Sequence, residues 1–503
     1  MNMPVFKYFY SLLLIVFILS LAGLAQTQQP KTITILHTND IHAGFIPHEA
    51  LWRKENPKPL VGGFSELSFV VDSIRKVKPT LLIDAGDVMT GNPITEYEYK
   101  GAFGGALFEM MNKISYEAWC FGNHDLDISQ QNLKKLVKIA KFPTLSANVV
   151  DNKGKFPFKN KKYVIINKNG IRIGVIGITS QSLYSLVNQN NLTGLKVLSP
   201  IETTQKLVNE IDPKTDLIIA LTHQGVGDDS VLAANVQGLD VIVGGHSHTR
   251  LNKPKFVNDV IIVQAGGNCE NLGELDLTVE NDKVTHYAGK LIQLWYREDR
   301  PKNELTKFVD SFKEKIDRDY SEVIGELKSD WKRGDGESAI GNFITDAQRE
   351  AVHADVAFMN NHGIRKDLNA GPITKRDLFE ILPFRNVLTT FQLSGNQIKS
   401  VVEYYIKKRP PIQTSGIICT WRVDRAGEIE IMNIEINGKP LDEDRLYSCT
   451  VNDYLAGEAK RHIGIEVNDA IYLKLTLFEE VEKAIKKAKI IESKIDNRIQ
   501  EIK

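Results

Sequence analysis

Five short polar clusters contain carboxylate, imidazole and amide side chains, which are the ligands that divalent metal ions take from proteins. Each cluster lies at the end of a stretch that is expected to form a strand. In chain order they are His37-Thr38-Asn39-Asp40-Ile41-His42, Asp84-Ala85-Gly86-Asp87, Gly122-Asn123-His124-Asp125, Thr222-His223-Gln224-Gly225 and Gly244-Gly245-His246-Ser247-His248-Thr249. A lone histidine after a strand is more often structural, but five such clusters in one region predict a metal centre assembled from loops.

The spacing within the clusters supports this prediction. Asp40 and His42 are one residue apart and can face the same side. Gly86 allows a sharp turn that projects Asp87, and the pair Gly244-Gly245 lets the backbone approach bound ions. These ligand types do not choose between Zn, Mn, Fe and Co, because affinity order and availability decide which ion is bound.

The elements that must position these clusters are strands alternating with helices. Strands are expected at 32–37, 80–83, 171–178, 217–221, 241–243 and 260–264. Helices are expected at 63–77, 129–140 and 201–211. This alternation predicts an α/β layered domain with its active groups on the loops after the strands.

A charged stretch from Arg297 to Tyr320 has helical spacing and is interpreted as a linker helix. Beyond it we expect helices at 339–352, 375–382 and 396–408, and strands at 417–423, 428–436 and 446–451. The predicted boundaries are 1–25 for a signal peptide, 30–297 for the metal domain, 298–322 for the linker helix and 323–503 for a C-terminal domain. A chain of 503 residues that is 42% hydrophobic has enough apolar material for two such cores.

The ordered D-x-H, G-D, G-N-H-D and G-H-x-H elements resemble those of the calcineurin-like metallophosphoesterases. That resemblance implies a four-layer-type β-sandwich flanked by helices, and a centre of two divalent ions. One ion would be held by Asp40, His42, Asp87 and His248. The other would be held by Asp87, Asn123, His223 and His246. Asp87 would therefore bridge the two ions.

The resemblance also implies that His124 acts on the transferring phosphoryl group rather than on a metal ion. Asp127, three residues further on, would orient its ring and stabilise its protonated form. Two ions roughly 3.5–4 Å apart polarise a phosphoryl oxygen and generate hydroxide near neutral pH. The alternative for His124 is that it only braces the loop that presents Asn123.

The C-terminal half resembles the C-terminal domain of the 5′-nucleotidases, which implies a smaller α+β substrate domain. The matching segments are Ile340 to Ala347, Asn360-Asn361-His362-Gly363-Ile364-Arg365, Leu382-Pro383-Phe384-Arg385-Asn386 and Asn452-Asp453-Tyr454-Leu455-Ala456. By resemblance, Arg365 binds the substrate with its fork of donors and Tyr454 stacks on the base. The alternatives are a capping or surface arginine and a core tyrosine.

Three departures from the family pattern put the nucleoside preference in doubt. His362-Gly363 replaces a pair of glycines, and Gly457-Glu458-Ala459-Lys460-Arg461 replaces a Gly-Gly-Asp element. The stretch 409–416 has no aromatic residue, so a second stacking ring is missing. Losing one ring of a stacked pair would cost roughly tenfold or more in affinity.

The charge balance and the N-terminal residues indicate which binding partners and which cellular location to expect. Lys+Arg and Asp+Glu are both 63, so no global charge draws the chain to nucleic acid, and we expect a small phosphoester as its partner. Lys7 precedes an apolar run from Tyr8 to Leu24, and small residues lead to Ala25, which predicts a cleaved signal peptide and a periplasmic or secreted protein. The alternative is an uncleaved N-terminal anchor.

The four cysteines, at 120, 269, 419 and 449, lack the spacing of a metal site. Cys419 and Cys449 could pair, although buried free thiols are the alternative.

The function that these features favour is an exported two-metal hydrolase that removes phosphate from nucleotides. The alternatives are a cyclic-nucleotide phosphodiesterase, a UDP-sugar hydrolase or pyrophosphatase, and a hydrolase of a non-nucleotide phosphoester. A surface ligand-binding protein with a non-catalytic metal domain is an alternative from another class.

Overall fold

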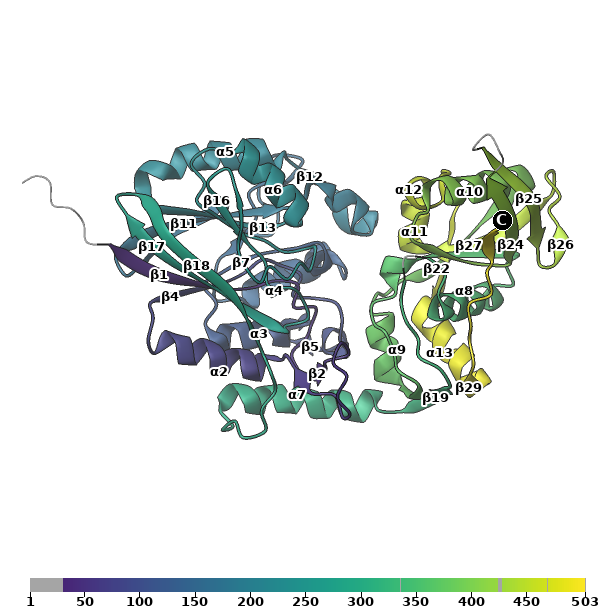
Figure 1. Cartoon of the computed structure of the whole chain (residues 1–503), viewed down its shortest axis with the longest axis horizontal. Coiled ribbons are helices and arrows are strands. Elements are labelled where there is room, and N and C mark those ends of the chain that lie inside the picture. Colours follow the sequence, from purple (N-terminus) through teal and green to yellow (C-terminus); the bar gives the residue numbers. More distant parts are fainter. Residues whose placement is uncertain (1–29, 335, 424–427, 468, 503) are drawn as a thin grey trace, which may run out of the picture.

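The computed structural model describes residues 30–334, 336–423, 428–467 and 469–502. They form two domains that are joined by the helix α7 (Glu304–Tyr320), which runs beneath the N-terminal domain and leads to the C-terminal domain in Figure 1. The predicted cleavage site and apolar run before it lie outside the described residues. Within the described part, no helix is long and apolar enough to cross a membrane.

The N-terminal domain contains two six-stranded sheets. The order of the first is β18-β17-β1-β4-β7-β8, formed by Lys283–Gln293, Asn271–Glu280, Lys31–Thr38, Thr80–Asp84, Ala118–Cys120 and Thr144–Leu145. The order of the second is β10-β11-β13-β14-β16-β15, formed by Tyr163–Lys168, Ile171–Thr179, Leu217–His223, Val241–Val243, Val260–Val263 and Lys255–Val257. The strands β1, β4, β7 and β8 are parallel, as are β11, β13, β14 and β16.

The N-terminal domain has four layers, in the order helices, sheet, sheet, helices, because side chains alternate between the two faces of each strand and both faces are buried. Ile33 and Ile35 of β1 share one buried core with Ile173 of β11, so the two sheets pack face to face. The opposite face of β1, with Leu36, packs on the helices α2 (Phe64–Arg75), α3 (Gly105–Ile114), α4 (Gln130–Ile139) and α7. The opposite face of β11, with Ile176, packs on α5 (Pro200–Ile211) and α6 (Val226–Asn235). The predicted helix-flanked sandwich is confirmed.

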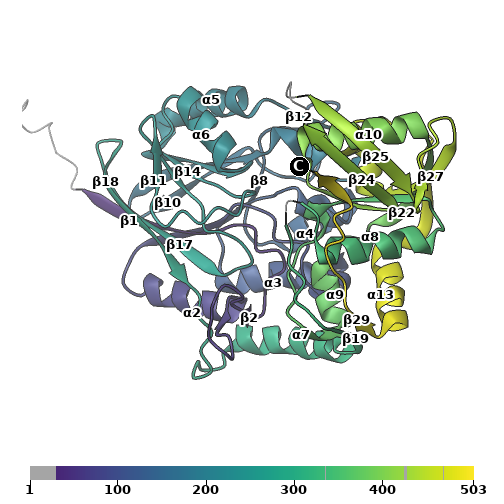
Figure 2. The same ribbon diagram turned by 45° about the vertical axis from the view of Figure 1, so that its right-hand side comes forward.

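The C-terminal domain is smaller and combines helices with sheets that contain both antiparallel and parallel strand pairs (Figure 2). Its five-stranded sheet is β23-β20-β27-β22-β28, formed by Ile412–Ser415, Val356–Asn360, Leu446–Asn452, Val387–Ser394 and Ile471–Thr476. The four-stranded sheet is β26-β25-β24-β30, formed by Lys439–Pro440, Ile429–Ile436, Ile417–Val423 and Ile499–Glu501. A third sheet is β21-β19-β29, formed by Gly371–Thr374, Val323–Leu327 and Ile490–Ile491. The helices are α8 (Ala339–Ala351), α9 (Lys375–Ile381), α10 (Gly395–Lys408), α11 (Asp453–Gly457), α12 (Ala459–Ile463) and α13 (Leu477–Ala488).

All four cysteines are buried and free, so the alternative of unpaired thiols holds for Cys419 and Cys449. They lie on β24 and β27, in different sheets of the C-terminal domain. Burial raises the pKa of the Cys419 thiol to about 11, which keeps it protonated and unreactive.

Candidate functional site

The polar clusters meet at the carboxyl ends of the parallel strands β1, β4, β7, β13 and β14. Their side chains form three overlapping groups whose ligand atoms lie within 4.8 Å of one another. The groups are Asp40-His42-His248, His42-Asp87-His124 and Asp87-His223-His246. Because His42 and Asp87 each belong to two groups, the arrangement is one continuous centre.

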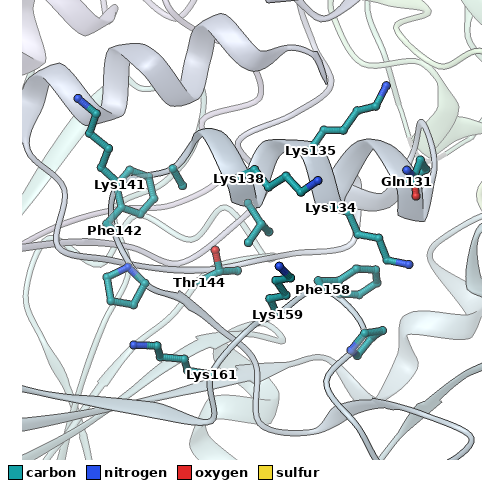
Figure 3. Close-up of a pocket in the computed structure, with 14 residues that line it drawn as sticks. Gln131, Lys134, Lys135, Lys138, Lys141, Phe142, Thr144, Phe158, Lys159 and Lys161 are labelled. Carbon is teal, nitrogen blue, oxygen red and sulfur yellow. The ribbon is translucent and has the colours of Figure 1, made fainter. Parts of the chain in front are cut away.

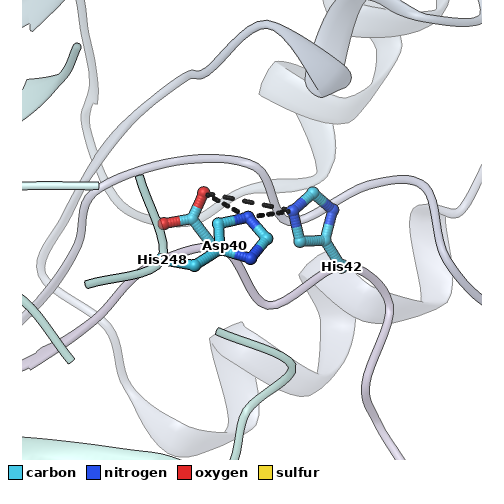
Figure 4. Close-up of side chains that lie close together, drawn as sticks. All are labelled: Asp40, His42 and His248. Atoms are coloured by element: carbon cyan, nitrogen blue, oxygen red, sulfur yellow. Dashed lines mark hydrogen bonds and ion pairs between the residues drawn. The ribbon is translucent and has the colours of Figure 1, made fainter. Parts of the chain in front are cut away.

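Asp40, His42 and His248 form the first predicted half of the centre, and Figure 4 shows them pointing at one another. The Nε2 atoms of His42 and His248 are 3.0 Å apart. The Asp40 Oδ1 atom is 3.4 Å from Nε2 of His248 and 4.0 Å from Nε2 of His42. Three donor atoms therefore converge on one small volume.

The second predicted half lies against the first. His223 Nε2 is 3.0 Å from Asp87 Oδ2 and 3.3 Å from Asn123 Oδ1. It is also 4.0 Å from Asp40 Oδ1, and the His223 and His246 rings have centroids 5.2 Å apart. All seven side chains predicted as metal ligands are thus brought together.

The backbone of the centre is bent to present these side chains. Asp40, His42, Asp87, His246 and His248 all have positive φ, a conformation that is uncommon for non-glycine residues. A Cβ on Gly86 would lie 2.7 Å from the Cys120 carbonyl oxygen, and one on Gly245 would lie 2.7 Å from that of Ala85. These glycines therefore let separate loops touch, and the positive φ of Gly86 is that of the sharp turn predicted before Asp87.

The donor set fits divalent cations. The Nδ1 atom of His42 contacts the Thr90 carbonyl at 3.0 Å, and Nδ1 of His223 contacts the Ala85 carbonyl at 2.7 Å. A carbonyl only accepts, so each Nδ1 carries the proton and each Nε2 faces the centre. Burial lowers the pKa of His246 to about 4, and the neighbouring His223 also lowers it, so this imidazole is neutral and able to ligate near pH 7.

Asp125 is a site residue that the sequence analysis did not single out. Its carboxylate accepts hydrogen bonds from the backbone N–H groups of Asp87, Val88, Met89 and Gly122, at 2.8–3.1 Å. It therefore ties the loop after β4 to the loop after β7. The sequence shows that Asp125 belongs to the G-N-H-D element, but its hydrogen bonds depend on where the loop after β4 lies in the folded chain.

His124 and Asp127 form the predicted pair. His124 Nδ1 is 2.7 Å from Asp127 Oδ2, and Thr90 donates to the same carboxylate oxygen at 2.7 Å. Burial lowers the pKa of His124, but the charges of Asp127 and Asp87 outweigh it and raise that pKa overall. The second nitrogen of the ring remains available to the centre.

The C-terminal domain reaches this centre through Arg365. Its Nη2 atom is 3.4 Å from His42 Nε2, and among the described residues no carboxylate lies within 4.0 Å of the guanidinium. The guanidinium is 5.9 Å from the centroid of the Phe384 ring, and that ring is 5.4 Å from the His124 ring. Phe384 belongs to the segment 382–386 that resembles the 5′-nucleotidase C-terminal domain, but the sequence predicts no role for it.

Tyr454 lies at the interface between the domains. Its hydroxyl donates to the Ser185 carbonyl oxygen at 2.7 Å, and its ring is 5.8 Å from that of His462. Nearby, Asn188 donates to Asp453 at 2.8 Å across the same interface. Tyr454 is therefore half-buried between the domains instead of packed in a core.

Comparison with known proteins identifies both halves of the chain. Residues 33–250 match the family model for calcineurin-like phosphoesterases, and residues 323–462 match that for the 5′-nucleotidase C-terminal domain. The 5′-nucleotidase of Vibrio cholerae is 29% identical over 87% of this chain and 88% of its own. Protein UshA of Yersinia enterocolitica is 28% identical over 84% and 85%.

A solved structure extends the likeness to the whole fold. The 5′-nucleotidase precursor of Thermus thermophilus superposes with a TM-score of 0.81 and 27% identity, over 94% of this chain and 99% of that one. Both family models match this one chain, in order along the sequence. The relatives named above match this chain over most of their own length. This protein therefore belongs to the 5′-nucleotidase family and is a metal-dependent phosphoric ester hydrolase.

Proposed function

We propose that the protein removes phosphate from nucleotides at a centre of two divalent ions, each Zn, Mn, Fe or Co. Asp40, His42, Asp87 and His248 would hold one ion, and Asp87, Asn123, His223 and His246 the other. The observation that supports this most is the membership of Asp87 in two overlapping ligand groups. Two such ions supply a polarised phosphoryl oxygen and an activated water molecule.

His124 is proposed to act on the phosphoryl group. Geometry alone would also allow it to ligate, since it lies in one group with His42 and Asp87. However, its Nδ1 atom is held by Asp127, which favours the protonated ring. A protonated imidazole cannot bind a metal ion, but it can donate to an oxygen on which charge develops.

Arg365 is proposed to hold the substrate. Its guanidinium lies beside the metal ligands with no carboxylate partner among the described residues, so its donors are available to a phosphate. Tyr454 is proposed to contact the base, and among the described residues the ring that contacts it is the His462 imidazole. The domain boundaries proposed for this division of labour are 30–297, 298–322 and 323–503.

Replacing Arg365 by Ala is expected to raise KM for AMP about 10- to 100-fold with unchanged metal content, because a charge-assisted contact to the substrate is lost. Arg365→Lys should recover part of that loss. Arg409→Ala is the matched control, since Arg409 is exposed and pairs with Glu501 away from the centre. Steady-state kinetics with metal analysis checks this, and an unchanged KM would exclude Arg365 from substrate binding.

The proposed function is tested by removing the metals with a chelator and adding back single ions. Phosphate release from AMP should vanish on chelation and return with at least one of the four metals. Chromatography of the products should also show that AMP is hydrolysed faster than a cyclic nucleotide, which would yield a nucleoside monophosphate, or a UDP-sugar, which would yield UMP and a sugar phosphate. A faster reaction with one of the latter substrates, or with a non-nucleotide ester, would replace the nucleotidase proposal with that activity. If no ester of a broad panel is hydrolysed while a nucleoside binds by calorimetry, the protein is a ligand-binding protein.

Export to the periplasm or the medium is also proposed, from the apolar run between Tyr8 and Leu24. Fractionation of cells, with N-terminal sequencing of the mature protein, would locate the protein and its first residue.

A further inference from the structure

A hollow of about 680 Å³ lies between the helix α4 and the loop at residues 157–161, with lysines around it (Figure 3). The lysines come from both sides of the hollow. They are Lys134, Lys135, Lys138, Lys141, Lys159 and Lys161. Between them the lining is mostly apolar, and it includes Val137, Pro143 and Phe158. The hollow shares no residue with the metal centre.

The charge of this hollow is not compensated locally. None of its 14 lining residues is acidic. Residues 128–201 contain eleven lysines and Arg172 but a single acid, Asp151, in a chain that is neutral as a whole. Lys168 and Arg172 are paired with Glu117 and Asp216. Within the part of the chain that the structure describes, the six lysines around the hollow form no ion pair.

Hydrogen bonds and an aromatic contact fix the shape of the hollow. Lys161 donates its backbone N–H to the Thr144 carbonyl oxygen at 2.8 Å, and Ser146 donates to that of Lys161 at 3.0 Å. The buried Asn160 donates from its side chain to the Ser146 carbonyl oxygen at 2.6 Å. The Phe158 ring packs edge-on against Phe121, with centroids 5.5 Å apart. Lysines from two elements are therefore kept close together in spite of their mutual repulsion.

We propose that this hollow binds a small anion with several phosphates, such as an inorganic or nucleoside polyphosphate. Like charges converging on one concavity are neutralised best by one multivalent anion. The volume falls within the roughly 300–1,000 Å³ that small-molecule sites occupy. A membrane surface would require a convex or flat face. A single-stranded nucleic acid would stack on exposed aromatic rings, whereas Phe142 and Phe158 are buried.

The experiment uses metal-loaded, full-length mature protein and the fluorescent anion pyrenetetrasulfonate, whose sulfonates are poor metal ligands. Its binding is followed by anisotropy, and it is then displaced with tripolyphosphate or orthophosphate at matched ionic strength. The variant Lys138→Ala/Lys159→Ala removes one charge from each side of the hollow. The control Lys206→Ala/Lys283→Ala removes two exposed lysines elsewhere in the same domain. Thermal unfolding verifies that both variants fold.

The hollow variant should bind the probe about tenfold more weakly or worse, and the control within about twofold of the parent protein. Tripolyphosphate should displace the probe at much lower concentration than orthophosphate, and hydrolysis of AMP should be the same in all three proteins. Equal binding by the hollow variant, or equal displacement by both phosphates, would overturn the proposal. So would lysine-dependent sedimentation with phosphatidylglycerol vesicles without displacement by tripolyphosphate, which would assign the face to a membrane.

Discussion

Asp87→Asn protein is expected to lose at least about a thousandfold in kcat/KM and most of its bound metal, because loss of a shared ligand weakens both halves of the centre by several kcal/mol. Asp87 has one oxygen 3.0 Å from His223 Nε2 and the other 2.7 Å from the backbone nitrogen of His124, so no neighbour can replace it. Phosphate release and metal analysis by mass spectrometry on the same sample measure both losses.

The control for this substitution is Asp299→Asn, which removes an exposed carboxylate just beyond the same domain. It should leave activity and metal content unchanged. Full turnover and full metal content in the Asp87→Asn protein would contradict the shared-ligand arrangement.

His124→Ala is expected to lower kcat about 100- to 1,000-fold while the metal content stays that of the parent protein, because a donor to the developing charge is removed without removing a ligand. Asp127→Asn should have a smaller effect on kcat. The Asp127 charge raises the pKa of His124, so its removal should also move the alkaline limb of the kcat profile to lower pH.

A pH–rate profile of each variant, with metal analysis, checks this second expectation. His286→Ala, at an exposed position on β18, is the matched control. If His124→Ala lost metal in proportion to activity, His124 would be a ligand and not a donor to the phosphoryl group.

The sequence predicts the fold best where a strand or helix carries its own pattern. The run at 171–178 is buried on both sides and appears as β11 (Ile171–Thr179), and the helix expected at 201–211 appears as α5. The sequence does not predict the hairpin of β17 and β18, because β18 is largely exposed and its hydrophobic alternation is weak. Its place at the sheet edge is fixed by its pairing with β17, which in turn pairs with β1, and no local pattern contains these pairings.

The same distinction applies to the site. The proposed ligands Asp40 and His248 could be predicted because their chemistry and their position after strands are local features. Asp125 contacts a loop 36 or more residues away, and Phe384 contacts His124 in the other domain. The residues next to them in the sequence therefore do not predict these contacts. Arg365 was predicted from a matching segment, but its approach to His42 depends on how the domains face each other.

The most direct test is a crystal structure of the metal-loaded protein with anomalous diffraction data collected at the absorption edge of the bound metal. Two peaks roughly 3.5–4 Å apart are expected, with the Asp87 carboxylate in contact with both and Asn123 and His248 on opposite sides. A single peak, or a pair of peaks that Asp87 does not join, would contradict the account.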